Sequence, residues 1–303
     1  MNRPRPGLVV LVLTVGVAAV SAAAIFIRFA FACAGEATPG LALLLAAVRL
    51  GLAALFLAPT WPGLLRARPQ PGAFALAALA GLFLAAHFGT WVASLAYTSV
   101  AASVTIVTTN PIWVALFGWL WLGEQVSRLT LAGILVATAG GALIGLGDAT
   151  GAAAGPAPLL GDALALAGAW TVSGYFLLGR EAQRRGLSIG QYVAVAYAAA
   201  ALALLPLPAL FGTPYTGWPP AFYGYALAMA LTSQLIGHTS FNWAVRWVPP
   251  VLVTLAILFE PLGSGLLAYA FFGETPPPLV FAGAGVLLAG VGLAVLGRGG
   301  AGR

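Results

Sequence analysis

The sequence contains no lysine and only one cysteine, Cys33. Without lysine the chain cannot form the Walker A loop that binds nucleotide phosphates, and it has no amine side chain for a Schiff base. These absences argue against ATP hydrolysis by this chain as an energy source. A lone cysteine forms neither an internal disulfide nor a cysteine metal cluster, and we expect no metal site and no cofactor.

Charge is also scarce in this chain. Only 7% of the residues are charged, whereas soluble domains have about 25%. Hydrophobic residues make up 61%, and the mean hydropathy is +1.00. At roughly 30 residues for a spanning helix and its connection, the length allows about ten membrane spans. The composition therefore predicts a polytopic membrane protein in a lipid bilayer and excludes a nucleic-acid partner, despite a net charge of +6.

Ten apolar segments can be placed along the chain, separated by turn-rich breaks. They cover residues 8–32, 38–59, 71–96, 99–122, 128–147, 160–180, 188–211, 220–243, 249–272 and 277–297. In hydrocarbon each segment must satisfy its own backbone hydrogen bonds, so we expect α-helices. The first run exceeds the length of a signal peptide's apolar region, so we expect a retained helix.

Arginine positions orient these ten helices. With the N-terminus in the cytoplasm, every arginine except Arg28 and Arg49 falls in a cytoplasmic segment, and none falls in an outer loop. This distribution follows the positive-inside rule. The sequence therefore predicts that both termini are cytoplasmic.

An internal repeat divides the chain into two units. A shift of 150 residues aligns 105–147 with 255–297 without a gap, and 13 of the 43 positions are identical. Matched glycines and prolines, such as Pro111 and Pro261, carry more weight than matched leucines. We expect five-helix repeats at 8–147 and 160–297, joined by a linker at 148–159. Because five is odd, the second repeat is inverted, as in many transporters.

These repeated residues resemble a known family. The pattern of Asn110-Pro111 followed by Gly123-Glu124, its copy Glu260-Pro261 followed by Gly273-Glu274, the segment 161–180 and Arg49 are similar to the EamA-type domain. The resemblance implies a ten-helix member of the drug/metabolite transporter superfamily. It further implies a carrier of small metabolites in the bacterial inner membrane, with amino-acid exporters well represented.

The two prolines point to a substrate site. Proline removes a backbone donor, and breaks at matching depth in two halves mark the binding site of many transporters. Asn110 and Glu260 are the polar residues next to Pro111 and Pro261. Asn110 could instead serve a helix kink alone. Glu260 could bind an ammonium group, exchange protons or form a fixed ion pair with an intramembrane arginine.

Arg49 is the most deeply placed arginine of the predicted helices. It lies about eleven residues into the second segment, too deep to reach the membrane surface easily. It could bind a substrate carboxylate or pair with Glu260, and both alternatives remain open. Arg28 lies near the outer end of the first helix, where we expect it to line the vestibule or reach the interface.

Aromatic residues and a histidine complete the candidate cavity. Trp91 follows His87 by one helical turn, and Trp113, Trp170 and Tyr175 also fall within predicted helices. They could line a cavity for an apolar or aromatic substrate. The alternative is that they pack between helices or face lipid.

The leading hypothesis is an exporter of small metabolites that works by alternating access. Amino acids, including aromatic and other large apolar ones, are the favoured cargo, and protons are a candidate coupling ion. Drugs and other amphipathic molecules are the alternative. Nucleotide sugars would need more cationic residues than Arg28 and Arg49. An intramembrane enzyme is disfavoured because the His-Glu-x-x-His and Gly-x-Ser-x-Gly motifs are absent. Facilitated diffusion and the oligomeric state remain open.

Overall fold

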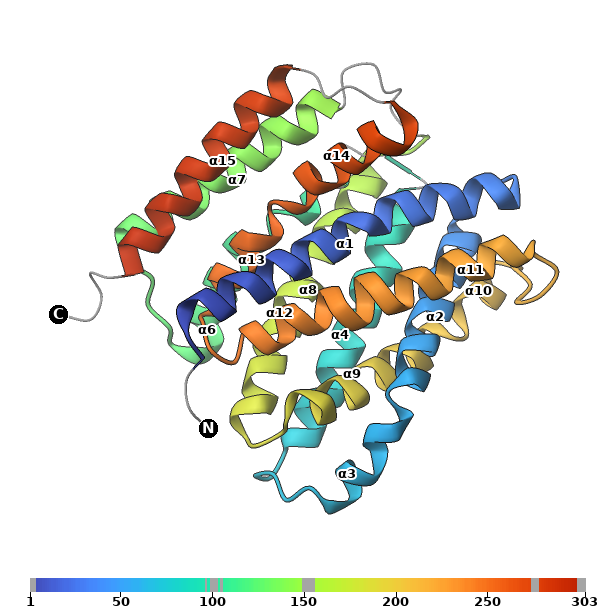
Figure 1. Cartoon of the computed structure of the whole chain (residues 1–303), viewed down its shortest axis with the longest axis horizontal. Helices are drawn as coiled ribbons and strands as arrows, with labels where there is room; N and C mark the ends of the chain where they lie inside the picture. The colour runs from blue at the N-terminus through green and yellow to red at the C-terminus, as the bar shows by residue number, and fades with distance from the viewer. Residues whose placement is uncertain are drawn as a thin grey trace.

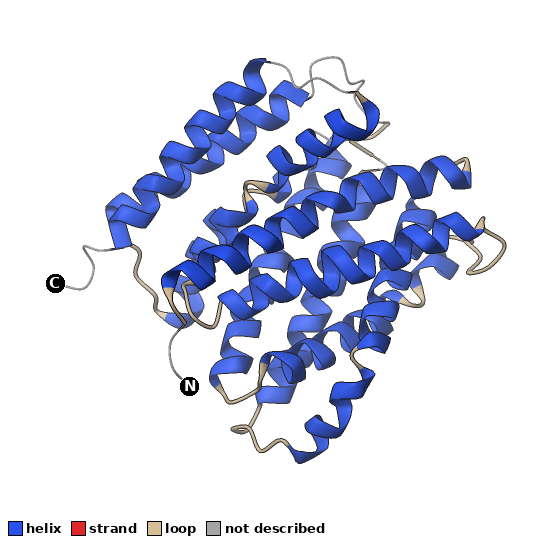
Figure 2. Ribbon diagram, viewed as in Figure 1, coloured by secondary structure: helices blue, strands red, loops and turns tan. Residues whose placement is uncertain are grey.

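A computed structural model describes residues 4–95, 97, 98, 103, 106–148, 156–273 and 278–298, with the backbone alone at 145, 147, 148 and 298. Every regular element in this part of the chain is helical, as Figure 2 shows. Six helical stretches are long and apolar enough to cross a membrane: Pro6–Ala34, Pro39–Phe56, Ala73–Ser94, Ile189–Leu210, Pro250–Phe272 and Pro278–Gly297. An all-helical membrane fold is therefore present, as the composition predicts.

The first half of the chain begins with two long apolar helices, and short helical turns follow them. Its elements are α1 (Pro6–Ala34), α2 (Pro39–Phe56), η1 (Ala58–Thr60), α3 (Trp61–Arg66), α4 (Ala73–Ser94), α6 (Asn110–Leu122) and α7 (Arg128–Asp148). The expected segment 38–59 is shorter in the structure, because Pro59 cannot donate a hydrogen bond to continue α2. Much of the expected segment 99–122 before α6 lies outside the described residues.

The second half contains a helix with a π-helical insertion. Its elements are α8 (Pro158–Arg184), α9 (Ile189–Leu204), α10 (Leu207–Leu210), α11 (Pro220–Met229), the π-helix η2 (Ala230–His238), α12 (Thr239–Ala244), α13 (Pro250–Ile257), α14 (Glu260–Phe272) and α15 (Pro278–Arg298). Elements α11, η2 and α12 follow one another without a loop, so they form the helix expected at 220–243. The helix expected at 249–272 is broken between α13 and α14.

Helices α7 and α15 pack side by side through the glycines that the two repeats share (Figure 1). A Cβ atom added to Gly140 would lie 2.3 Å from the backbone nitrogen of Leu287, and one added to Gly290 would lie 2.2 Å from that of Ala137. Gly133, farther toward the start of α7, meets Ala294, so the two helices are antiparallel. Small residues let these backbones approach closely.

The interior of the remaining bundle is centred on α4. This helix packs against α8 and α9, and α2 packs against α9 and α4. Helix α1 runs along α11, η2 and α14, and Figure 1 shows it crossing the front of the bundle. Helices from both halves are therefore interleaved around one interior.

Candidate functional site

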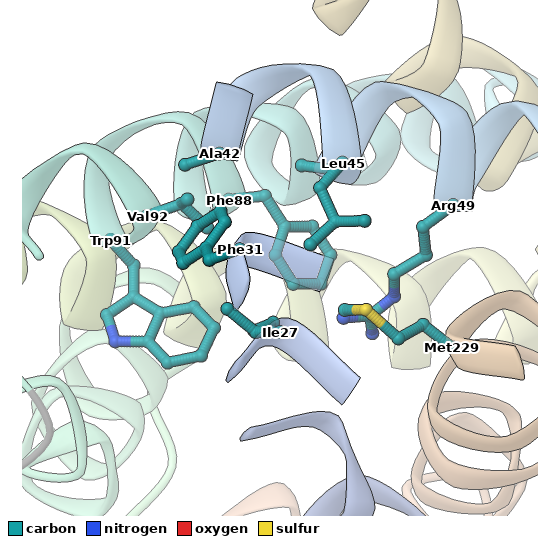
Figure 3. A pocket seen from close by; sticks show the side chains of 10 residues that line it. Ile27, Phe31, Ala42, Leu45, Arg49, Phe88, Trp91, Val92 and Met229 are labelled. Atoms are coloured by element: carbon teal, nitrogen blue, oxygen red, sulfur yellow. The ribbon is translucent and has the colours of Figure 1, made fainter. Parts of the chain in front are cut away.

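A narrow cavity lies where α1, α2, α4 and α11 meet. Its volume is about 10 Å³, which is room for about one water molecule in this conformation, and among the described residues Arg49 is the only charged one in its wall. Figure 3 shows Arg49 at one end and Trp91 at the other, with Ile27 between them. The other lining residues are apolar: Phe31, Ala42, Leu45, Ala46, Phe88, Val92 and Met229. The cavity therefore combines one positive charge with an apolar wall.

Arg49 is held by a neutral partner rather than by a carboxylate. Its side chain is buried, and its Nε and Nη2 atoms donate to Oε1 of Gln234 at 3.1 and 2.8 Å. Its guanidinium carbon lies 4.5 Å from the ring centroid of Phe88, a cation–π arrangement. Nη1 donates to no described residue. The positive charge is thus anchored but not neutralised.

Glu260 does not neutralise Arg49. No ion pair joins the two side chains, both of which are described, although their charges attract each other from a greater distance. Glu260 is partly buried and begins α14. The fixed Arg49–Glu260 pair that the sequence left open is therefore absent in this conformation.

The two proline positions coincide with helix starts. Helix α6 begins at Asn110 and α14 begins at Glu260, so each proline lies in the first turn of its helix. The Ser173 hydroxyl lies 3.3 Å from the backbone carbonyl of Asn110, and the Ser21 hydroxyl lies 3.2 Å from that of Glu260. Each hydroxyl shares its proton with a shorter bond, of 2.7 and 2.8 Å, to the carbonyl four residues earlier in its own helix. These serines lie on α8 and α1, the first helices of the opposite repeats. Asn110 is buried against α8, and its Oδ1 has no partner among the described residues.

His87 packs against Trp91, a residue of the cavity wall. Its Nδ1 lies 2.9 Å from the carbonyl oxygen of Gly168, which assigns the proton to Nδ1 because a carbonyl can only accept. The imidazole stacks on Trp91, with ring centroids 5.8 Å apart. Trp91 lines the cavity, and its buried Nε1 has no hydrogen-bond partner in the described part of the chain. His87 therefore fixes the orientation of a wall residue.

The remaining aromatic candidates lie elsewhere. Trp113 and Trp170 pack edge to face at 5.4 Å between α6 and α8, and Trp113 Nε1 donates to Thr109. Tyr175 is fully buried and accepts a hydrogen bond from Asn242. None of these three, nor Asn110, Glu260 or either proline, is among the residues that line the cavity. Of the residues proposed from sequence, the structure brings together Arg49, Trp91 and, behind them, His87.

Sequence reasoning missed the residues that hold Arg49. Gln234 and Phe88 contact the guanidinium, and Gln234 lies in the apolar segment 220–243. A polar amide in an apolar membrane segment commonly forms a hydrogen bond to another helix. The position of Gln234 in such a segment could therefore have marked it as a candidate. The π-helical turn that carries Gln234 has no comparable signature in the sequence.

A separate ion pair uses the repeated Gly-Glu motif. Nη2 of the buried Arg180 lies 2.6 Å from Oε1 of Glu124, which joins the end of α6 to α8. The guanidinium carbon of Arg28 lies 4.0 Å from the ring centroid of Phe272. Arg28 therefore links α1 to α14, and Arg180 links α8 to the end of α6.

Comparison with known proteins identifies related chains. The model of the EamA-like transporter family matches residues 9–146 and again 159–296. A curated relative from Streptantibioticus cattleyicolor, named "Probable terminal-alkyne amino-acid exporter", is 27% identical over 189 residues, which are 61% of this chain and 61% of that protein. A solved crystal structure, described without a function, has a TM-score of 0.73 at 19% identity and covers 96% of this chain and 98% of its own. This last likeness concerns the fold.

Proposed function

Because the chain belongs to the EamA-like transporter family, we propose that it exports small carboxylates with apolar side chains, most of all amino acids. The single observation that carries this proposal is Arg49, a buried positive charge without a carboxylate partner among the described residues, in an apolar cavity. When the cavity widens during the transport cycle, a carboxylate would pair with the guanidinium, and an apolar side chain would contact the aromatic and aliphatic wall. The amino-acid exporter among its relatives supports the same substrate class.

In this proposal the multi-pass chain spans the bacterial inner membrane ten times, with both termini in the cytoplasm. The repeats at 8–147 and 160–297 move against each other, and Pro111 and Pro261 lie near the bending points. Their breaks at matching depth support alternating access. In this proposal the carrier moves its substrate across the membrane without changing any covalent bond of that substrate, so it is not an enzyme.

Glu260 is proposed to receive the ammonium group of the substrate. It is a carboxylate whose charge interacts with that of Arg49, and no ion pair with a described side chain occupies it. Opposite charges on separate helices would align a zwitterion in one direction. The same carboxylate is the candidate for proton coupling, because intramembrane carboxylates commonly carry protons in transporters.

Counterflow in proteoliposomes tests this function. The purified protein would be supplied with labelled aromatic, branched and cationic amino acids, each with matched empty liposomes. We expect saturable counterflow of aromatic and branched amino acids and much slower counterflow of cationic ones. Absence of counterflow for every amino acid would overturn the proposed substrate class. Saturable movement of an amphipathic drug instead would favour the alternative cargo.

A further inference from the structure

The π-helix η2 places one particular side chain against Arg49. It spans Ala230–His238 between the α-helices α11 and α12. A π-helical turn inserts an extra residue into a helix, changes the direction of the side chains that follow, and occurs mostly at functional sites. Gln234 lies at the middle of this insertion and is completely buried. Its amide is therefore delivered to the interior by an uncommon backbone conformation.

The orientation of the Gln234 amide is fixed by chemistry. Its Oε1 accepts hydrogen bonds from both Nε and Nη2 of Arg49. The flipped amide would direct two N–H donors at a guanidinium that has no acceptor. Nε2 therefore points away from these two nitrogens, and it is buried without a hydrogen-bond partner among the described residues. An unpaired buried donor is unfavourable unless another molecule supplies an acceptor.

The backbone behind Gln234 is held firmly. Tyr197 and Thr239 both donate to the carbonyl oxygen of Gln234, at 3.4 and 3.3 Å. Asn242 in turn donates to the Tyr197 hydroxyl at 3.3 Å. These neutral groups fix the position of the turn and add no charge that could compensate Arg49. The amide and the guanidinium therefore form one rigid pair of donors.

We propose that Gln234 is a substrate-binding and specificity-determining residue that receives the substrate carboxylate together with Arg49. Gln234 occupies the Nε–Nη2 side of the guanidinium, so Nη1 and the outer hydrogen of Nη2 remain for an anion. Guanidinium forks bind carboxylates through two parallel hydrogen bonds. Nε2 of Gln234 then supplies a third donor to the same carboxylate. This inference rests on the proposed function and adds the residue that recognises the acid group.

A neutral amide tests this role because it presents a donor where the acid presents an acceptor. The wild-type protein would be compared with Gln234→Glu by counterflow of labelled phenylalanine, with phenylalanine and phenylalaninamide as competitors. The introduced carboxylate would retain an acceptor for Arg49, remove the Nε2 donor and neutralise the guanidinium. We expect the preference for the acid over the amide to fall at least about tenfold, since a site built to hydrogen-bond one group rejects its analogue.

Two further variants separate recognition from stability. Gln191→Glu makes the same chemical change at a partly exposed capping residue of α9, where glutamate can also cap, and should leave the preference unchanged. Gln234→Met removes both polar atoms while keeping the length of the side chain, and it provides the measurement if Gln234→Glu does not fold. An unchanged acid preference in a folded Gln234 variant would overturn this inference. Absence of amino-acid counterflow in the wild-type protein would instead overturn the proposed function.

Discussion

The helix breaks before Pro111 and Pro261 occupy matching positions in the two repeats, and their backbones are held in the same way. In each case a serine from the first helix of the opposite repeat reaches the carbonyl of the residue before the proline, Ser173 at Asn110 and Ser21 at Glu260, while its hydroxyl also donates to its own helix. The side chains at the two breaks differ. Asn110 is a neutral amide buried against α8, whereas Glu260 is a carboxylate whose charge interacts with Arg49.

The same contrast holds for the second helix of each repeat. Helix α2 carries Arg49, while the corresponding helix α9 contains no charged residue. The repeated features are backbone features: helix breaks, serine contacts and the close packing of α7 on α15. The charges that could recognise a substrate occur once each, on Arg49 and Glu260. The repeat therefore provides a symmetric scaffold, and single residues provide a directional site.

Removing the charge on Arg49 should have the largest effect on transport. Arg49→Gln would lose the hydrogen bonds to the substrate carboxylate, each of which contributes about 1.5–3 kcal/mol when one partner is charged. We expect counterflow of phenylalanine to fall at least about 100-fold, which corresponds to two such bonds. Arg66→Gln, at an exposed position of α3, is the matched control and should transport normally. Equal loss in both variants would contradict a specific role for Arg49.

Larger residues at the shared glycines should disrupt the scaffold. Gly290→Leu would force α15 away from Ala137, and overpacking of this kind destabilises by about 1–3 kcal/mol or more. Gly292→Leu is the control on the same helix, because a Cβ at Gly292 meets no described atom within 4 Å. We expect a lower melting temperature for Gly290→Leu alone. Gly140→Leu should match Gly290→Leu, and a large difference between them would contradict the symmetric packing.

Neutralising Glu260 should show that the two helix breaks differ in function. Glu260→Gln is expected to reduce counterflow of the zwitterion by about tenfold, as expected for one lost charge-assisted hydrogen bond. It should also flatten the pH dependence of transport while leaving the melting temperature unchanged. Adding Asn110→Asp to the Glu260→Gln variant would place a carboxylate at the matching break, and it should not restore transport. A loss of stability with unchanged transport per folded molecule would assign Glu260 a structural role instead.

The smallest expected effects come from the two serines. Interhelical hydrogen bonds within membranes average about 0.6 kcal/mol, so Ser21→Ala and Ser173→Ala should each lower stability by about that amount. Reversible unfolding in detergent would measure both changes. A marked inequality between the two would show that the breaks are not equivalent in their backbone contacts.

The helices and the breaks could be predicted from sequence because their causes are local. Hydropathy marks segments that need internal hydrogen bonds. Pro111 and Pro261 would interrupt the hydrogen-bond ladder inside a longer helix, so each falls in the first turn of a new one. The glycines of α7 and α15 were visible as repeat-matched positions. Their contact with each other was not, because it depends on how the two repeats are arranged in space.

The cavity was predicted only in part. Arg49 and Trp91 lie in its wall, but Trp113, Trp170 and Tyr175 lie elsewhere, because the rotation of each helix about its axis is set by packing. Gln234 was missed because its direction depends on a π-helical turn rather than on residue spacing. A sequence pattern based on 3.6 residues per turn cannot place a side chain within such an insertion.

The most direct test of a carboxylate-binding cavity compares three competitors in proteoliposomes. Counterflow of labelled phenylalanine would be measured against unlabelled phenylalanine, its amide, and phenethylamine, which lacks the acid group. A carboxylate held by Arg49 requires strong competition by phenylalanine and weak competition by the other two. Equal competition by phenethylamine would contradict it, because the acid group would then contribute nothing to binding.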